Sequence, residues 1–277
     1  MKKQRTWFIT GASKGFGLAL TKLALSQGDN VISTSRNGDA LRAAVGEHGA
    51  NFLPLQVDIT ADSAVKQAID HAIQHFGQID VVVNNAGYSL VGSVEEMDDA
   101  AFRETMDVNL FATVHVIRHI MPHFRAQQTG HIINIASIAG YYGIPCAASY
   151  NAAKFAVVGL SEGLAKEVEP LGIHVTVIAP GEFRTNFMDK GSIKYVENRI
   201  PIYGIDEAEE SWTASSGQQL GDPEKLVKII TEIVAMEKPP KRLLLGPDAY
   251  AMYTEQKATE TEEIEQWKST TLSTNFD

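Results

Sequence analysis

Short runs of apolar, often β-branched residues alternate with longer amphipathic stretches along most of this chain. Seven of the runs are expected to be strands, namely Thr6–Thr10, Asn30–Ser35, Asn51–Val57, Asp80–Asn84, His131–Ala136, His174–Ala179 and Arg242–Leu245. The amphipathic stretches, expected to be helices, lie at residues 17–27, 39–47, 61–76, 98–127 and 149–169. Strands that alternate with helices build βαβ units around a parallel sheet. We therefore predict an α/β fold, a doubly wound parallel sheet of about seven strands with helices on both faces.

The length and composition are those of one folded domain. The chain has 277 residues, of which 44% are hydrophobic and 21% charged, and α/β domains of this size often fold as one unit. We treat residues 1–277 as a single domain. The alternation lapses over about residues 182–220, which we interpret as a substrate lid because long irregular segments in compact domains often cover sites. Residues 247–277 are expected to form a helical C-terminal extension.

Charge, hydropathy and cysteine content exclude several classes of partner and location. The net charge of −10 argues against a nucleic-acid or anionic-membrane partner, since both favour basic surfaces. No apolar run approaches the roughly 18 residues of a transmembrane helix, and the apolar stretch after the basic N-terminus is too short for a signal peptide. The single cysteine, Cys146, excludes an intrachain disulfide and fits a reducing cytoplasm, which is the expected location.

A glycine-rich turn follows the first expected strand and opens the first expected helix. Glycine lets the backbone approach a phosphate closely, and the free N–H groups at a helix N-terminus attract negative charge. The spacing is G-x3-G-x-G rather than G-x-G-x-x-G, so a plain strand–turn–helix is the alternative. We predict a Rossmann-type site for a dinucleotide pyrophosphate, formed by Gly11, Ser13, Lys14, Gly15, Phe16 and Gly17.

The second expected strand indicates which dinucleotide is bound. An acidic residue at its end would accept the ribose 2′-hydroxyl of NAD, whereas an arginine suits the 2′-phosphate of NADP. The strand ends at Ser35 without an acid, Arg36 follows directly, and Lys14 stands in the glycine turn. We therefore predict that NADP is preferred over NAD; the alternative is that both cations are ordinary exposed loop charges.

Several polar residues share the end of the sheet at which that turn lies. Tyr150 and Lys154 are four residues apart at the start of an expected helix, and so lie on one face of it. Ser137 follows a strand, and so does the turn Asn84-Asn85-Ala86-Gly87. The carboxyl ends of parallel strands open on one crevice. Each motif alone is common, but together they predict one site beside the nucleotide.

In these motifs the chain resembles the short-chain dehydrogenase/reductase family over about residues 5–246. The matching residues, in the family's order, are Thr10-Gly11-x3-Gly15-x-Gly17, Asp58, Asn84-Asn85-Ala86-Gly87, Asn109, Ser137, Tyr150-x3-Lys154 and Pro180-Gly181 with Thr185. The C-terminal part, from Gly221-Asp222-Pro223 through the helical tail to Trp267, is similar to a bacterial subgroup of oxidoreductases related to retinoid and steroid dehydrogenases.

The resemblance implies an NADP(H)-dependent oxidoreductase that interconverts a ketone or aldehyde and an alcohol. The nicotinamide supplies hydride, Tyr150 is the general acid/base, Lys154 lowers its pKa, and Ser137 holds the substrate oxygen. By the same resemblance Lys154 also holds the nicotinamide ribose, and Asn109, counted with the catalytic residues, anchors a water next to Lys154. The remaining implied cofactor contacts are Asp58 to the adenine, Thr185 to the carboxamide, and Ile59, Asn85, Ala86, Gly87, Pro180, Gly181 and Phe183.

The residues expected to contact substrate are mostly aromatic or apolar, as in most ligand pockets. They are Ser137, Tyr141, Tyr142, Phe187 and Met188. They favour a small, moderately hydrophobic carbonyl compound or alcohol. Two other functions are open: an NADP-binding regulator without turnover, and an isomerase or dehydratase on the same fold.

Two further expectations concern metals and assembly. His115, His119 and His123 recur at helical spacing, but neither Cys nor Glu completes a ligand set, so no metal site is expected. The resemblance implies a homo-oligomer, a dimer or tetramer, that pairs the helices at 98–127 and 149–169 between subunits.

Overall fold

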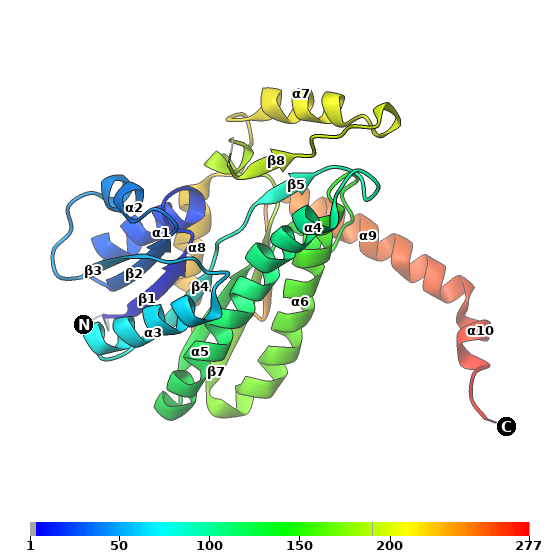
Figure 1. Cartoon of the computed structure of the whole chain (residues 1–277). Helices are drawn as coiled ribbons and strands as arrows, with labels where there is room; N and C mark the ends of the chain where they lie inside the picture. The colour runs from blue at the N-terminus through cyan, green and yellow to red at the C-terminus, as the bar shows by residue number, and fades with distance from the viewer. Residues whose placement is uncertain (1–3, 190, 277) are drawn as a thin grey trace.

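The computed structural model describes residues 4–189 and 191–276, and its centre is a twisted sheet of seven parallel strands (Figure 1). The strand order is β3-β2-β1-β4-β6-β7-β9. It reverses between β1 and β4, which makes the sheet doubly wound and confirms the predicted fold class. The strands are β1 (Thr6–Thr10), β2 (Asn30–Ser35), β3 (Phe52–Gln56), β4 (Val81–Asn84), β6 (Gly130–Ile135), β7 (Ile173–Pro180) and β9 (Arg242–Leu245).

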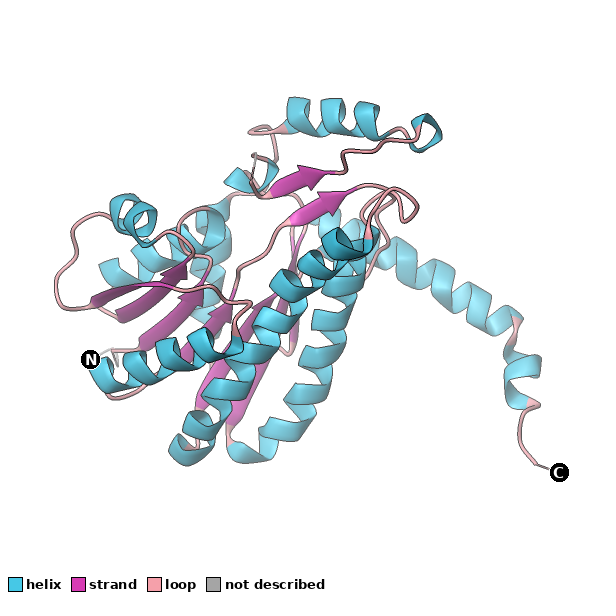
Figure 2. Ribbon diagram, in the orientation of Figure 1, coloured by secondary structure: helices cyan, strands magenta, loops and turns pink. Residues whose placement is uncertain are grey.

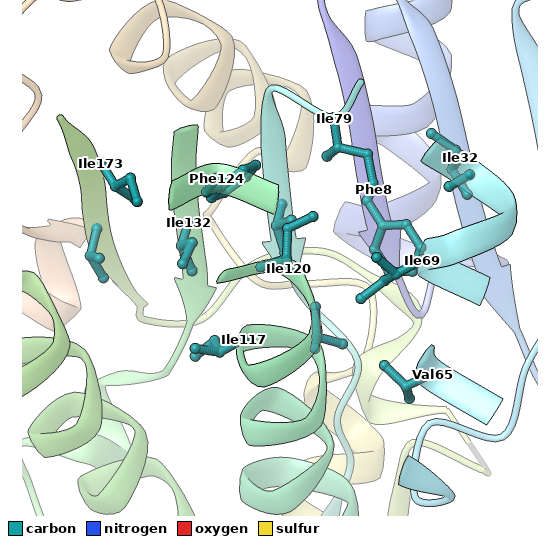
Figure 3. Close-up of a cluster of buried hydrophobic side chains, with 14 of the residues drawn as sticks. Phe8, Ile32, Val65, Ile69, Ile79, Ile117, Ile120, Phe124, Ile132 and Ile173 are labelled. Atoms are coloured by element: carbon teal, nitrogen blue, oxygen red, sulfur yellow. The ribbon is translucent and has the colours of Figure 1, made fainter. Parts of the chain in front are cut away.

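Helices cover both faces of this sheet (Figure 2). On one face α1 (Gly15–Ser26), α2 (Gly38–Val45) and α8 (Pro223–Ile233) pack on side chains that include Trp7 and Ile9. On the other face α3 (Asp62–Phe76), α5 (Ala112–Gln127) and α6 (Ala148–Val168) pack on side chains that include Phe8. Figure 3 shows this second core, in which Phe8 lies close to Ile69. Because successive residues of β1 enter opposite cores, both faces must be apolar, which explains the continuous apolar runs.

The long helix expected at residues 98–127 is interrupted. Its first part is α4 (Asp99–Met106), a π-helical turn covers Asp107–Phe111, and α5 follows. The π turn carries Asn109, whose side chain is 1% exposed. Its Nδ2 donates to the carbonyl oxygens of Thr105 and Tyr88, each at 2.9 Å. The interruption therefore fixes an amide beneath the turn that follows β4.

The segment expected to be an irregular lid contains regular structure. Its short strand β8 (Ile193–Tyr195) pairs in parallel with β5 (Ser89–Val91), and α7 (Ile205–Ser215) follows. In Figure 1, β5, β8 and α7 lie beyond the carboxyl ends of the central strands. Strands of three residues carry too little periodicity to be predicted. That the segment works as a lid stays a prediction.

The C-terminal extension is one long helix, α9 (Pro247–Gln266), followed by α10 (Lys268–Leu272). Ala249 in the first turn is buried, whereas all residues from 261 to 276 are exposed. The helix leaves the body at a steep angle (Figure 1). In the part of the chain that the structure describes, no helix is both long and apolar enough to cross a membrane.

Candidate active site

A cavity of about 1100 Å³ opens at the carboxyl ends of the strands, around the point where the strand order reverses. Ligands bind at this place in doubly wound sheets. All predicted cofactor-binding residues except Gly17 line it, and so do the predicted substrate contacts other than Tyr141. The structure therefore brings together side chains that lie more than a hundred positions apart in the sequence.

The glycine turn has the shape that a phosphate site requires. Gly11 and Gly15 have φ angles of +66° and +55°, a region that side chains disfavour. A Cβ on Gly11 would lie 2.7 Å from the Cα of Ala86. Gly17 lies behind the turn, since its Cβ would come within 2.6 Å of the Gly11 carbonyl oxygen. Gly17 thus packs the turn against the sheet and does not line the cavity.

The turn after β4 is fastened to the glycine turn by hydrogen bonds. The Nδ2 of Asn85 donates to the carbonyl oxygens of Thr10 at 2.9 Å and Gly11 at 3.1 Å. The hydroxyl of Thr10 in turn accepts from the backbone N–H groups of Asn85 at 3.0 Å and Ala86 at 3.1 Å. The two predicted motifs are therefore one rigid unit.

The residues around this unit fit a dinucleotide. Helix α1 has no side-chain cap and no acidic residue in its first turn, so its free N–H groups remain available to an anion. Thr34 and Gln219 line the cavity, and within the described residues the Thr34 hydroxyl and the Gln219 Nε2 are buried without a hydrogen-bond partner. Buried polar atoms of this kind are normally satisfied, and a polar ligand in the cavity is one way to satisfy them.

Charged side chains gather at the nucleotide end of the cavity. Arg36 follows β2 and is exposed, and Lys14 stands at the N-cap of α1; both line the cavity. Asp58 lines it as well, and hydrogen bonds from the hydroxyl and N–H of Thr60, at 2.7 and 3.0 Å, hold its pKa below the usual value. The positive charge of Arg36 lowers that pKa further. This end of the cavity thus carries two cations and one carboxylate.

The three predicted catalytic residues lie together. Tyr150 is in the first turn of α6 and is 9% exposed. Ser137 follows β6, and its hydroxyl lies near enough to Tyr150 to lower the pKa of the phenol. The Nζ of Lys154 lies 5.5 Å from the centre of the Tyr150 ring and donates to the carbonyl oxygen of Ile135 at 3.0 Å.

Burial dominates the pKa of both ionisable catalytic residues. It raises the pKa of Tyr150 to about 12, although the Ser137 hydroxyl opposes the rise. It also lowers the pKa of Lys154 to about 8, because burial disfavours a charged group. That Lys154 lowers the Tyr150 pKa stays a prediction. At neutral pH Tyr150 is a protonated phenol, the form that can donate a proton.

Asn109 supports the site from behind and does not line the cavity. Its Oδ1 accepts from the N–H of Tyr88 at 3.2 Å, in addition to the bond from its Nδ2 to the Tyr88 carbonyl. A Cβ on Gly87 would lie 2.6 Å from this oxygen and 3.5 Å from the Lys154 Nζ. Asn109 therefore positions the turn next to Lys154. Its water-anchoring role stays a prediction.

At the substrate end, the ring of Phe187 faces Tyr150 with 6.0 Å between ring centres, and Tyr142 and Met188 also line the wall. Tyr141, which was predicted to contact substrate, does not line the cavity. It packs edge-on against Tyr253 of α9, 5.3 Å between ring centres, because the short 3₁₀ turn Ile138–Gly140 points the two consecutive tyrosines in different directions.

Three further lining residues come from segments outside the recognised motifs. They are Trp212 of α7, and Asp248 and Met252 of α9. The Oδ2 of Asp248 accepts from the N–H of Glu182 at 2.6 Å. The only sequence signal for these residues is their place in the expected lid and extension.

The three histidines of α5 and Cys146 contact other parts of the fold. His119 and His115 face Asp62 of α3, with Nε2–Oδ1 distances of 3.0 and 3.9 Å, and His123 accepts from the N–H of Ile79 at 3.2 Å. Over residues 4–189 and 191–276, no group of three metal-binding side chains comes together. Cys146 contacts the lid, its Sγ 3.6 Å from the carbonyl oxygen of Tyr203, and burial raises its pKa.

Comparison with known proteins places this site in context. The family model described as short chain dehydrogenase matches residues 5–195. Oxidoreductase BOA17 of Botryotinia fuckeliana is 36% identical over 97% of this chain and 98% of its own length. The 3-ketodihydrosphingosine reductase of Bacteroides thetaiotaomicron is 35% identical over 90% and 91%.

Solved structures agree with these relatives. A short-chain dehydrogenase from Streptomyces avermitilis superposes with a TM-score of 0.91 at 33% identity, covering 99% of this chain and 100% of that one. ElxO with NADP bound superposes with a TM-score of 0.73 at 27% identity, covering 87% and 96%.

Proposed function

Since the chain belongs to the short-chain dehydrogenase family, whose members act as oxidoreductases, we propose that it interconverts a ketone or aldehyde and the corresponding alcohol with NADP(H). The observation that carries the proposal is the group formed by Tyr150, Ser137 and Lys154. All three line the cavity that also contains the glycine turn. A proton donor, an oxygen-binding hydroxyl and a cation beside a nucleotide cradle are what reduction of a carbonyl needs.

Each residue has a defined part in this reaction. The bound nicotinamide supplies or accepts the hydride. The Ser137 hydroxyl donates a hydrogen bond to the carbonyl oxygen and stabilises the negative charge that develops there. The Tyr150 phenol transfers its proton to the same oxygen, and its position in the first turn of α6 favours the resulting phenolate, because a helix N-terminus stabilises negative charge. Lys154 adds a positive charge next to the ring and is placed to contact the nicotinamide ribose.

The cofactor is proposed to be NADP(H). Arg36 and Lys14 both line the nucleotide end, and β2 ends without an acidic residue. ElxO, a structural neighbour, was solved with NADP bound. The residues that we assign to the cofactor are those of the cavity lining around the glycine turn, the turn after β4 and the loop after β7.

The proposal also covers the substrate, the cellular location and the oligomeric state. The wall beside Tyr150 carries Phe187, Tyr142 and Met188, and we infer a hydrophobic carbonyl compound. The relative named 3-ketodihydrosphingosine reductase supports a ketone as the reacting group. We place the enzyme in the cytoplasm as a homo-oligomer.

A panel of ketones, aldehydes and alcohols tests the proposal, followed at the nicotinamide absorbance with NADP(H) and NAD(H) in parallel. Tyr150→Phe should abolish turnover and leave cofactor binding largely intact, because Phe keeps the ring and loses only the phenolic oxygen. Tyr250→Phe, at a tyrosine that is 66% exposed on α9, is the matched control and should keep full activity. Cofactor binding without turnover of any substrate would favour a regulator, and conversion without net cofactor oxidation would favour an isomerase or dehydratase.

A further inference from the structure

The lid lines the cavity with the polar residues Asn186, Ser192 and Gln219 and with a larger group of apolar side chains, which form an apolar wall. Next to Tyr150 this wall consists of Phe187, Ile144 and Ala147, which form one hydrophobic cluster. Farther out it continues with lining side chains that pack in the adjacent cluster, Tyr88, Met188, Ile193 and Trp212. A small carbonyl compound would contact only the first of these groups.

Charge is distributed unevenly between the two sides of the cavity. Lys14 and Arg36 lie at the nucleotide end and Lys154 lies beside Tyr150. Over residues 183–189 and 191–220, the lid contributes no ionisable side chain to the lining. Glu104 lines the cavity there and pairs with Lys194, whose Nζ also lies 4.6 Å from the centre of the Tyr88 ring. An anionic group on the substrate would meet the Glu104 carboxylate and a lysine that is already paired, so it would lose its hydration without gaining a free partner.

Two strongly exposed apolar side chains, Val94 and Ile202, lie in segments that contact this side of the cavity. Val94 is 69% exposed and Ile202 is 86% exposed. Their segments are joined by the hydroxyl of Tyr203, which donates to the Glu95 carboxylate at 2.6 Å. The carbonyl of Tyr203 contacts Cys146, the residue before Ala147 of the wall. Exposed apolar groups near a cavity are typical of the entrance of a hydrophobic ligand site, and we take these two segments as the entrance.

This entrance is held in place by polar contacts on its outer side. One oxygen of Glu96 accepts from the N–H of Ile200 at 2.6 Å, and the other accepts from the N–H of Ser93 at 2.8 Å. Arg199 pairs with Glu209 of α7 at 2.6 Å. The β5–β8 pairing adds backbone hydrogen bonds between the same two segments. The apolar path is therefore already formed before a substrate binds.

From this path we propose that the lid side binds an unbranched alkyl chain attached to the reacting carbonyl carbon. The substrates would then be long-chain ketones and the matching secondary alcohols, with an uncharged chain running from Tyr150 past Phe187 toward Trp212 and the entrance. The inference rests on the proposed function, and it adds the substrate class to it. Each methylene that moves from water into such a wall contributes about 0.8 kcal/mol, which corresponds to roughly a fourfold gain in affinity.

A homologous series of 2-alkanones from 2-butanone to 2-decanone measures this effect directly. We expect kcat/KM to rise by roughly threefold to fourfold per added methylene until the chain reaches the entrance. A profile that is flat or falls with chain length, with short ketones still reduced, would overturn the inference and leave the proposed function standing.

Variants of the wall test where the chain lies. Trp212→Ala should lower the ratio of kcat/KM for 2-decanone to that for 2-butanone by about tenfold or more, as expected for several lost methylene contacts. A lower ratio in Trp212→Ala alone does not separate a lost contact from a disturbed lid. Met188→Thr removes wall contacts without touching α7, and it should lower the same ratio. Trp267→Ala, at a tryptophan that is 62% exposed on the distant extension, is the matched control and should leave the ratio unchanged. An unchanged ratio in both wall variants would contradict the assignment.

A binding measurement keeps the inference testable without turnover. The chain has three tryptophans, of which Trp7 is fully buried in the sheet, so Trp267→Phe leaves Trp212 as the one that can respond to a ligand in the cavity. We expect 1-decanol to change its fluorescence saturably at concentrations at which 1-butanol and decanoate do not. Absence of a response to 1-decanol would refute the alkyl-chain site. A response to 1-decanol combined with no reduction of any carbonyl would support the site and count against the proposed reaction.

Discussion

The Asp248 carboxylate accepts a 2.6 Å hydrogen bond from the backbone N–H of Glu182, and so joins the first turn of α9 to the loop that leaves β7. The fit is close, since a Cβ on Gly181 would lie only 2.0 Å from the same oxygen. This loop continues to Phe183 and Thr185, both in the cavity lining. The C-terminal helix is therefore a structural part of the candidate active site, although most of its length projects away from the body.

This contact leads to a first prediction. Asp248→Ala should weaken NADP(H) binding by roughly tenfold, because a hydrogen bond to a charged group contributes about 1.5–3 kcal/mol and its loss frees the loop that carries Thr185. Asp248→Asn keeps an acceptor oxygen and should retain most of the affinity. Calorimetric titration with NADP+ measures both. Asp39→Ala, at an exposed aspartate in the first turn of α2, is the control. Equal losses in the Ala and Asn variants would show that the accepted hydrogen bond is not what holds the loop.

The pH dependence follows from the pKa of Tyr150, which burial raises to about 12. A proton donor must be protonated, so its contribution to carbonyl reduction is present below that pKa and is lost only as the pH approaches it. We therefore expect the rate of reduction at saturating cofactor to be nearly constant from about pH 6 to pH 7, and to fall only as Lys154 loses its charge around pH 8. Alcohol oxidation needs the phenolate and should rise steadily over the same interval. A reduction profile that falls with a midpoint near neutrality would mean that bound cofactor lowers this pKa strongly.

Lys154 should affect both binding and rate. Its pKa is lowered to about 8 by burial, so its charge is present below that pH and is lost above it. Lys154→Met keeps most of the stem but removes the charge; it should raise the Kd for NADP(H) and lower kcat together. Fluorescence titration of NADPH and steady-state kinetics separate the two. If only kcat fell, the proposed contact with the nicotinamide ribose would be wrong.

The sequence predicts the sheet well because strand position depends on local apolar runs. Three of the seven strands, β1, β2 and β9, have the predicted bounds, and the others differ by one residue at one or both ends. The glycine turn and the Tyr150–Lys154 pair are likewise local patterns. For these features, residue type and spacing already contain the structural information.

Other features depend on contacts that spacing does not reveal. The π turn at Asn109 keeps a helical pattern and changes only which side chains point inward. The raised pKa of Tyr150 depends on how much protein surrounds it. Asp248 and Trp212 reach the cavity only because the first turn of α9 and the helix α7 lie next to the strand ends. These were beyond sequence reasoning because each results from tertiary packing.

The surface of α6 and the π turn supports a prediction about assembly. Phe111 and Phe155 are 47% and 46% exposed, and a Cβ on Gly159 or Gly163 of α6 would meet nothing within 4 Å. Large exposed aromatic groups beside small residues favour close packing against another helix. We expect light scattering to give a dimer or tetramer, and Phe155→Asp to shift it toward the monomer. Leu272→Asp, at an exposed apolar position on α10, is the control. A monomeric mass at all dilutions of the unmodified protein would contradict the expectation.

Cofactor choice is expected to depend mainly on Arg36. It lines the cavity directly after β2, a strand whose last residues are Ser33, Thr34 and Ser35, so no carboxylate there can bind the ribose diol of NAD. Arginine can contact a phosphate through two parallel hydrogen bonds. Bonds of this kind contribute about 1.5–3 kcal/mol each, and we therefore expect kcat/KM to be at least about tenfold higher with NADP(H) than with NAD(H).

Arg36→Ala should remove most of this preference by weakening NADP(H) while changing NAD(H) little, because only the 2′-phosphate distinguishes the two. Lys14→Ala should have a smaller effect, since the lysine ammonium is a single, more strongly hydrated charge. Arg42→Ala, at an exposed arginine of α2 that pairs with Asp39, serves as the matched control. The measurement is kcat/KM for both cofactors with one substrate at a fixed concentration. Equal use of NADP(H) and NAD(H) by the unmodified protein would show that neither Arg36 nor Lys14 contacts the 2′-phosphate.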